Sequence, residues 1–67
     1  MDEDKLNMQV RKFLKKVGIQ SQREIERAVN DLAERGELPD GRPVRAVVTL
    51  SVEALGVDER IEGDIDF

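Results

Sequence analysis

The 67-residue chain contains no cysteine, histidine, tryptophan or tyrosine, and these absences exclude several classes of chemistry. Disulfides require cysteine, while zinc, copper and iron–sulfur sites rely mainly on cysteine and histidine. The chain also lacks a thiol nucleophile and an imidazole for acid–base work near neutral pH. We therefore expect no catalytic residue, no cofactor and no metal, and a protein that is not an enzyme.

The length permits one small domain over residues 1–67. A chain of this size hides only roughly 60% of the surface that its unfolded form exposes, so its stability is marginal. Small domains usually add a disulfide, a metal or a partner subunit. The first two are disfavoured by the composition, which leaves a partner subunit as the open option.

The chain also lacks a long apolar run. No segment approaches the roughly 20 apolar residues of a membrane span. The first four residues, Met1–Asp4, are acidic and do not resemble a secretory signal. We expect a cytoplasmic protein without a membrane partner.

The first apolar repeat predicts a helix over about residues 3–17. Five residues form one stripe at helical spacing: Leu6, Val10, Phe13, Leu14 and Val17. Acidic residues precede the stripe, and basic residues lie at its end, as the helix dipole favours. Gly18 follows, at the position where glycine often ends a helix.

A second helix is predicted over about residues 22–35. Ser21 and Glu24 have the spacing of a capping box, which marks a helix start. Helical spacing then relates five apolar residues: Ile25, Ala28, Val29, Leu32 and Ala33. Gly36 supplies the stop. The following Leu38-Pro39-Asp40-Gly41 has the composition of a type I turn.

The last third of the sequence predicts two strands, over about residues 44–52 and 60–67, although Val57 also has the correct parity to begin the second. Apolar and polar residues alternate with period two in both segments, and Gly56 is the expected turn residue. So short a connection favours antiparallel pairing. The predicted fold is α+β in the order ααββ, with the two helices packed on a β-hairpin around one small core.

Charge is divided unevenly along the chain. Residues 1–36 hold eight basic and seven acidic side chains, whereas residues 37–67 hold three basic and eight acidic ones. The basic group near the end of the first predicted helix makes Lys12, Lys15 and Lys16 candidate contacts for an acidic partner. The helix dipole and a solvated face explain the same residues without a partner.

The short link from Gly18 to Ser21 raises an alternative, because it resembles the turn of a helix-turn-helix. The second helix would then enter the major groove with Arg23, Arg27 and Asn30 as nucleic-acid contacts. Three features oppose this hypothesis: the turn is about one residue too long, no third helix is predicted, and the net charge is −4.

A two-stranded sheet has two open edges, which favours association. Val47 points away from the predicted core, on the less charged strand. A dimer with two-fold symmetry that joins the first strands would form a four-stranded sheet and cover Val47. A monomer with one exposed valine is the simpler alternative.

Four segments resemble a family of small uncharacterised bacterial proteins of similar length, with the same helical opening and a strand-rich tail. They are residues 7–8, 11–15, 17–19 and 21–26. The resemblance implies a bacterial cytosolic source and transfers no activity, cofactor or site. The leading hypothesis is a small non-enzymatic domain that acts through a protein partner or as a homodimer.

Overall fold

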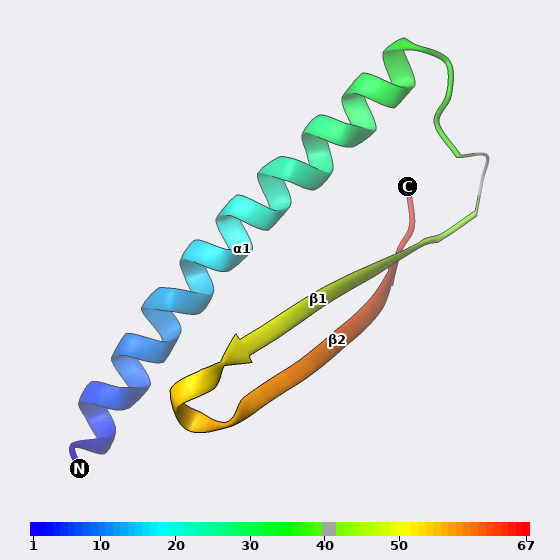
Figure 1. Cartoon of the computed structure of the whole chain (residues 1–67). Coiled ribbons are helices and arrows are strands. Elements are labelled where there is room, and N and C mark those ends of the chain that lie inside the picture. Colours follow the sequence, from blue (N-terminus) through cyan, green and yellow to red (C-terminus); the bar gives the residue numbers. More distant parts are fainter. Residues whose placement is uncertain (40–41) are drawn as a thin grey trace.

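The computed structural model describes residues 1–39 and 42–67, and within them the fold is α+β (Figure 1). A long helix comes first, α1 (Glu3–Glu34). Strand β1 (Val44–Val52), the one-turn 3-10 helix η1 (Glu53–Leu55) and strand β2 (Val57–Ile65) follow it. The turn predicted at residues 38–41 includes Asp40 and Gly41, which lie outside the described residues.

The amino-terminal part of the chain is one helix of 32 residues, so the prediction of two helices, over 3–17 and 22–35, is wrong. Gly18 does not adopt a left-handed conformation, and Ser21 lies inside the helix instead of capping one. No proline interrupts residues 3–34. A glycine inside a helix costs about 1 kcal/mol, whereas a break leaves up to four N–H and four C=O groups unpaired at the new ends.

The phase of the apolar residues also favours a continuous helix. They recur at intervals of 4, 4 and 3 residues, and the polar Ser21 occupies one place in this series. The apolar members are Leu6, Val10, Leu14, Val17, Ile25, Ala28 and Leu32. This is an eleven-residue repeat, which drifts by only about 20° per repeat on an ideal helix, so these residues form one face along α1. The two predicted apolar stripes are therefore halves of one stripe, here called the apolar stripe.

Both ends of α1 are capped. The Asp2 Oδ1 atom accepts a hydrogen bond of 3.0 Å from the Lys5 backbone N–H. At the other end, Gly36 has a φ of 67°. Its N–H donates to the Ala33 carbonyl at 3.1 Å, and the Glu37 N–H donates to the Leu32 carbonyl at 2.8 Å. This pair of bonds is a Schellman motif, which confirms Gly36 as the helix stop.

The carboxyl-terminal part is the antiparallel hairpin that the sequence predicted. The bounds of β1 are confirmed. Strand β2 runs from Val57 to Ile65, earlier than the predicted 60–67, because Val52 pairs with Val57 and Val44 pairs with Ile65. Gly56, with a φ of 66°, forms the left-handed end of η1 and confirms the expected turn residue.

The hairpin has one mainly apolar and one mainly polar face. Cross-strand pairs on the apolar face are Val44–Ile65, Ala46–Gly63, Val48–Ile61, Leu50–Glu59 and Val52–Val57. On the polar face the pairs are Arg45–Asp64, Val47–Glu62, Thr49–Arg60 and Ser51–Asp58. The predicted alternation is correct, with Glu59 as one carboxylate among the apolar positions.

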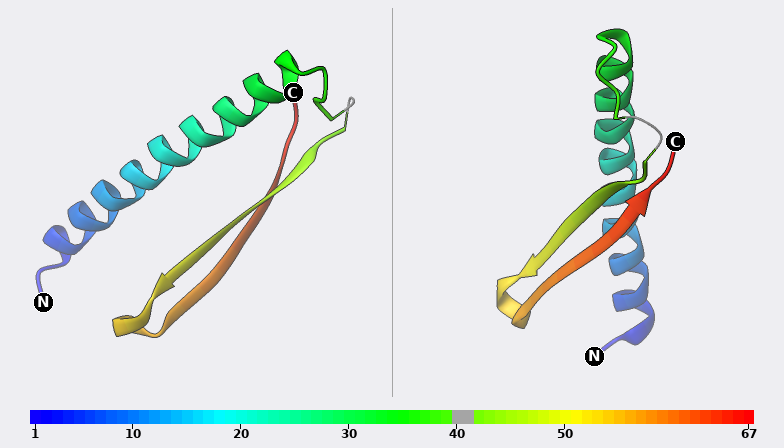
Figure 2. Two further views of the ribbon diagram at one scale, coloured as in Figure 1. Left: turned by 45° about the horizontal axis from the view of Figure 1, so that its top comes forward. Right: turned by 90° about the vertical axis from the view of Figure 1, so that its right-hand side faces the viewer.

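The predicted packing of helix on hairpin is wrong, because none of the described residues is buried. Helix α1 and the hairpin diverge along much of their length (Figure 2). The chain exposes 6282 Å², whereas a compact protein of its mass exposes about 4,300 Å². Its radius of gyration is 16.0 Å, against about 11 Å for a compact chain of this length. A single rod of about 48 Å cannot wrap around the sheet as two shorter helices could.

Candidate interaction surfaces

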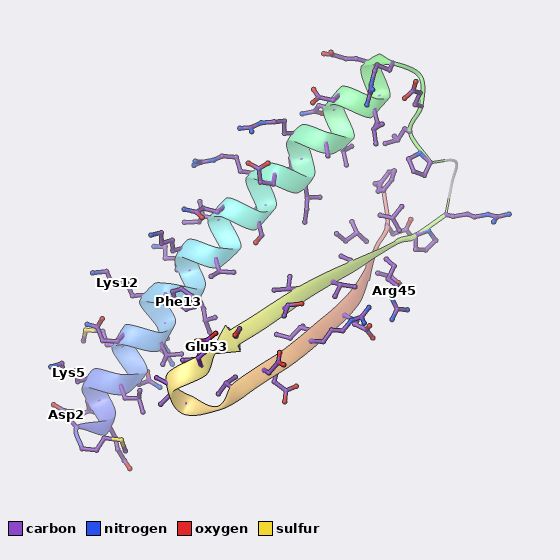
Figure 3. All side chains as sticks on the ribbon, in the orientation of Figure 1. Asp2, Lys5, Lys12, Phe13, Arg45 and Glu53 are labelled. Carbon is purple, nitrogen blue, oxygen red and sulfur yellow. The ribbon has the colours of Figure 1, made fainter. Side chains whose placement is uncertain are left out.

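The amino-terminal half of the apolar stripe is exposed. Leu6 is 49% exposed, Val10 45% and Phe13 53%. Phe13 lies on the side of α1 toward the hairpin, and Lys5 and Lys12 project from the opposite side (Figure 3). This half of the stripe therefore lies on the side of α1 toward the hairpin, and the described chain leaves it uncovered.

Where the carboxyl-terminal half of α1 approaches the open end of the hairpin, an apolar groove is present. The helix lines it with Ile25, Val29 and Leu32, and the strands line it with Val44 and Ile65. Helix and hairpin thus begin to enclose an apolar space at this end. They do not complete a core there.

The polar face of the hairpin places Val47 away from α1, at a position opposite Glu62, and leaves Val47 42% exposed. The Glu62 carboxylate forms ion pairs with Arg45, at 2.7 Å, and with Arg60, at 3.0 Å. On this face β1 also carries Thr49 and Ser51, whereas every side chain of β2 is charged. The uncharged side chains of the polar face therefore lie on β1.

The basic residues Lys12, Lys15 and Lys16 lie near the middle of α1, not at a helix end. The dipole effect is confined to the first and last turns of a helix, and the last turn of α1 contains no basic residue. The dipole explanation of these three lysines is therefore wrong. Their accumulation on the helix has to be explained by solvation or by a partner.

The nucleic-acid candidates Arg23, Arg27 and Asn30 belong to this same helix. The turn required by a helix-turn-helix is absent, since residues 18–21 are helical. Arg27 forms an exposed ion pair with Glu24 at 3.3 Å. The structure therefore has no helix-turn-helix at residues 18–21. It places the basic candidates and the nucleic-acid candidates on the same helix, α1.

At about 100° per residue, six polar side chains of α1 fall within a sector of about 40° opposite the apolar stripe. They are Lys5, Lys12, Lys16, Arg23, Asn30 and, at the end of the helix, Glu34. Lys15 lies beside this sector. Sequence reasoning missed Lys5 as a member, because it considered only the basic group near the end of the first predicted helix. The common phase of the apolar residues was the signal that could have identified the face.

Within residues 1–39 and 42–67, no group of three or more acidic side chains is placed to hold a metal ion. Within the same ranges, no helix has the length and apolar character needed to cross a membrane. The candidate sites that the structure offers are therefore surfaces.

A family of unknown function (DUF6494) matches residues 1–67. The chain belongs to this family. The resemblance to a family of uncharacterised proteins is thereby confirmed, and it brings no function with it. Comparison with curated proteins and with solved structures gave no match. Function must therefore be inferred from the surfaces.

Proposed function

We propose that this member of DUF6494 is a non-enzymatic interaction protein that forms a homodimer through its β1 edge. The observation that supports this proposal is the exposed apolar surface: no described residue is buried, although both α1 and the hairpin have an apolar face. A solitary hairpin is marginally stable in water unless another element covers it. A second copy supplies that cover.

The amount of exposed surface fits a dimer. The chain exposes 6282 Å², which is about 2,000 Å² more than a compact protein of this mass. Removal of this excess from two copies would bury about 4,000 Å² in total, within the range of obligate homodimers. A small transient contact would leave most of the excess exposed.

The dimensions of the elements also fit. Two hairpins joined side by side make a sheet of four strands, about 19 Å wide at about 4.8 Å per strand. Two helices packed side by side occupy a similar width, at about 8–10 Å each. One apolar stripe per copy would then cover the apolar face of the joined sheet, and closure of each chain onto this sheet completes two layers.

Charge favours the β1 edge over the β2 edge. The polar face of β2 carries three carboxylates, Asp58, Glu62 and Asp64, against one cation, Arg60, so two such strands side by side would repel each other through their net negative charge. A two-fold axis at Val48, the middle of β1, pairs all nine residues of the strand with the second copy. In this register Val47 lies opposite Thr49 of the second copy.

Opposite charges at position 47 test the interface. Across the two-fold axis the two Val47 side chains are diagonal neighbours, about 7–8 Å apart. We expect the native chain to sediment at twice 7.6 kDa. The Val47→Lys variant and the Val47→Asp variant, each measured alone, should sediment as monomers. A mixture of the two variants should restore a heterodimer, which a merely misfolded variant could not do.

Asp58→Lys is the control, because Asp58 lies on the polar face of β2, away from the β1 edge. It should leave the dimer intact. A native chain that sediments as a monomer at all concentrations would overturn the proposal. So would a dimer that neither Val47 variant weakens.

A further inference from the structure

The central part of α1 carries a concentrated positive charge. Residues 5–23 contain six basic side chains and no acidic one: Lys5, Arg11, Lys12, Lys15, Lys16 and Arg23. Ion pairs elsewhere in the described chain use Arg27, Arg35, Arg45 and Arg60. The six central cations form no ion pair within residues 1–39 and 42–67, so the described part of the chain does not neutralise this charge.

The continuous helix arranges four of these cations in a straight row. Lys5, Lys12, Lys16 and Arg23 span about 27 Å along the axis, within a sector of about 40° opposite the apolar stripe. The row points away from the hairpin at its labelled members, Lys5 and Lys12 (Figure 3). Covering the apolar stripe would therefore leave the row open to a second partner.

We propose that this row binds the phosphodiester backbone of duplex nucleic acid without reading its sequence. The four cations of the row are spread over about 27 Å, a length over which one DNA strand carries about eight phosphates at 3.4 Å of axial rise each. Lysine contacts a phosphate as a point charge, which suits a backbone contact. The proposal rests on the proposed function in one respect, because the dimer is what covers the apolar stripe.

Features of the same face favour a duplex over other polyanions. It carries no aromatic side chain, so the base stacking that holds single strands is missing. An anionic membrane binds an amphipathic helix by burying its apolar face, and the dimer of the proposed function covers that face, so the row is left to a polyanion in solution. The acidic residues of the hairpin lie on a separate element, and salt screens exposed charges beyond about 10 Å at 0.1 M.

Salt-dependent binding measures the row directly. Fluorescence anisotropy with a labelled DNA duplex would be recorded between about 50 and 200 mM salt. Four phosphate contacts give a slope of log affinity against log salt of about −3.6. Lys12→Gln/Lys16→Gln removes two contacts and should reduce the slope by about 1.8.

Arg42→Gln/Arg60→Gln is the matched control, since it removes the same charge from residues outside the helix. It should keep the native slope. Circular dichroism and sedimentation of both variants separate loss of the row from loss of the helix or of the dimer. The proposal is overturned by absent DNA binding with intact helix, or by equal effects of both double variants. Equal or tighter binding to phosphatidylserine vesicles or to polyglutamate also overturns it.

Discussion

Gly18→Ala distinguishes a continuous helix from two helices, because the two arrangements require opposite changes in stability. In α1, Gly18 has ordinary helical geometry, and a Cβ atom built on it meets nothing within 4 Å. Alanine should then raise the free energy of unfolding by about 1 kcal/mol, since glycine loses more backbone entropy in a helix. At a left-handed helix stop, the same substitution would instead cost roughly 1–2 kcal/mol.

Urea unfolding followed by circular dichroism measures the difference. With an m value of about 1 kcal/mol/M, the midpoint should rise by about 1 M. Gly36→Ala provides the opposite control, because its φ of 67° strains any other residue. Its midpoint should fall by at least as much. A Gly18→Ala variant that is destabilised like Gly36→Ala, at a concentration where the chain is monomeric, would refute the continuous helix.

Two further substitutions test local contacts. Asp2→Ala removes the side-chain acceptor of the 3.0 Å bond from the Lys5 N–H, so amide exchange in the first turn should accelerate and stability should fall by about 1 kcal/mol; unchanged exchange would contradict the cap. Glu62→Gln removes the carboxylate shared by Arg45 and Arg60, and because these pairs are exposed its cost should stay below about 1 kcal/mol and shrink in high salt. A large loss that persists in high salt would show that Glu62 stabilises the hairpin by another route.

Local signals predicted the hairpin well. Alternation from Val44 to Val52, with Val47 as its one exception, defined β1, and Gly56 marked the left-handed turn residue. The second strand began earlier than predicted because Val57 has a cross-strand partner in Val52. Where a strand ends depends on which residues of the adjacent strand are available for pairing. The alternation within one segment does not contain that information.

The helix was misread for a different physical reason. Gly18 and the spacing of Ser21 and Glu24 are each compatible with a break, but each is also tolerated inside a helix at modest cost. The apolar residues on both sides share one phase, and a break would split the stripe that they form. The helical phase shared by the apolar residues along α1 therefore outweighed the two local signals for a break, Gly18 and the spacing of Ser21 and Glu24. The absence of a core could not be predicted at all, because an apolar face in a sequence does not specify whether its partner lies in the same chain.

The same continuous helix changes the meaning of the candidate residues. While the chain was divided at Gly18, Lys12 and Lys16 ended one helix and Arg23 opened another, so their charges had separate local explanations. On one helix they fall in a single row with Lys5, opposite the apolar stripe. A net charge of −4 conceals this arrangement, because the acidic excess lies in the carboxyl-terminal half of the chain. Two faces of one helix can then serve two partners: a second copy on the apolar side and a polyanion on the basic side.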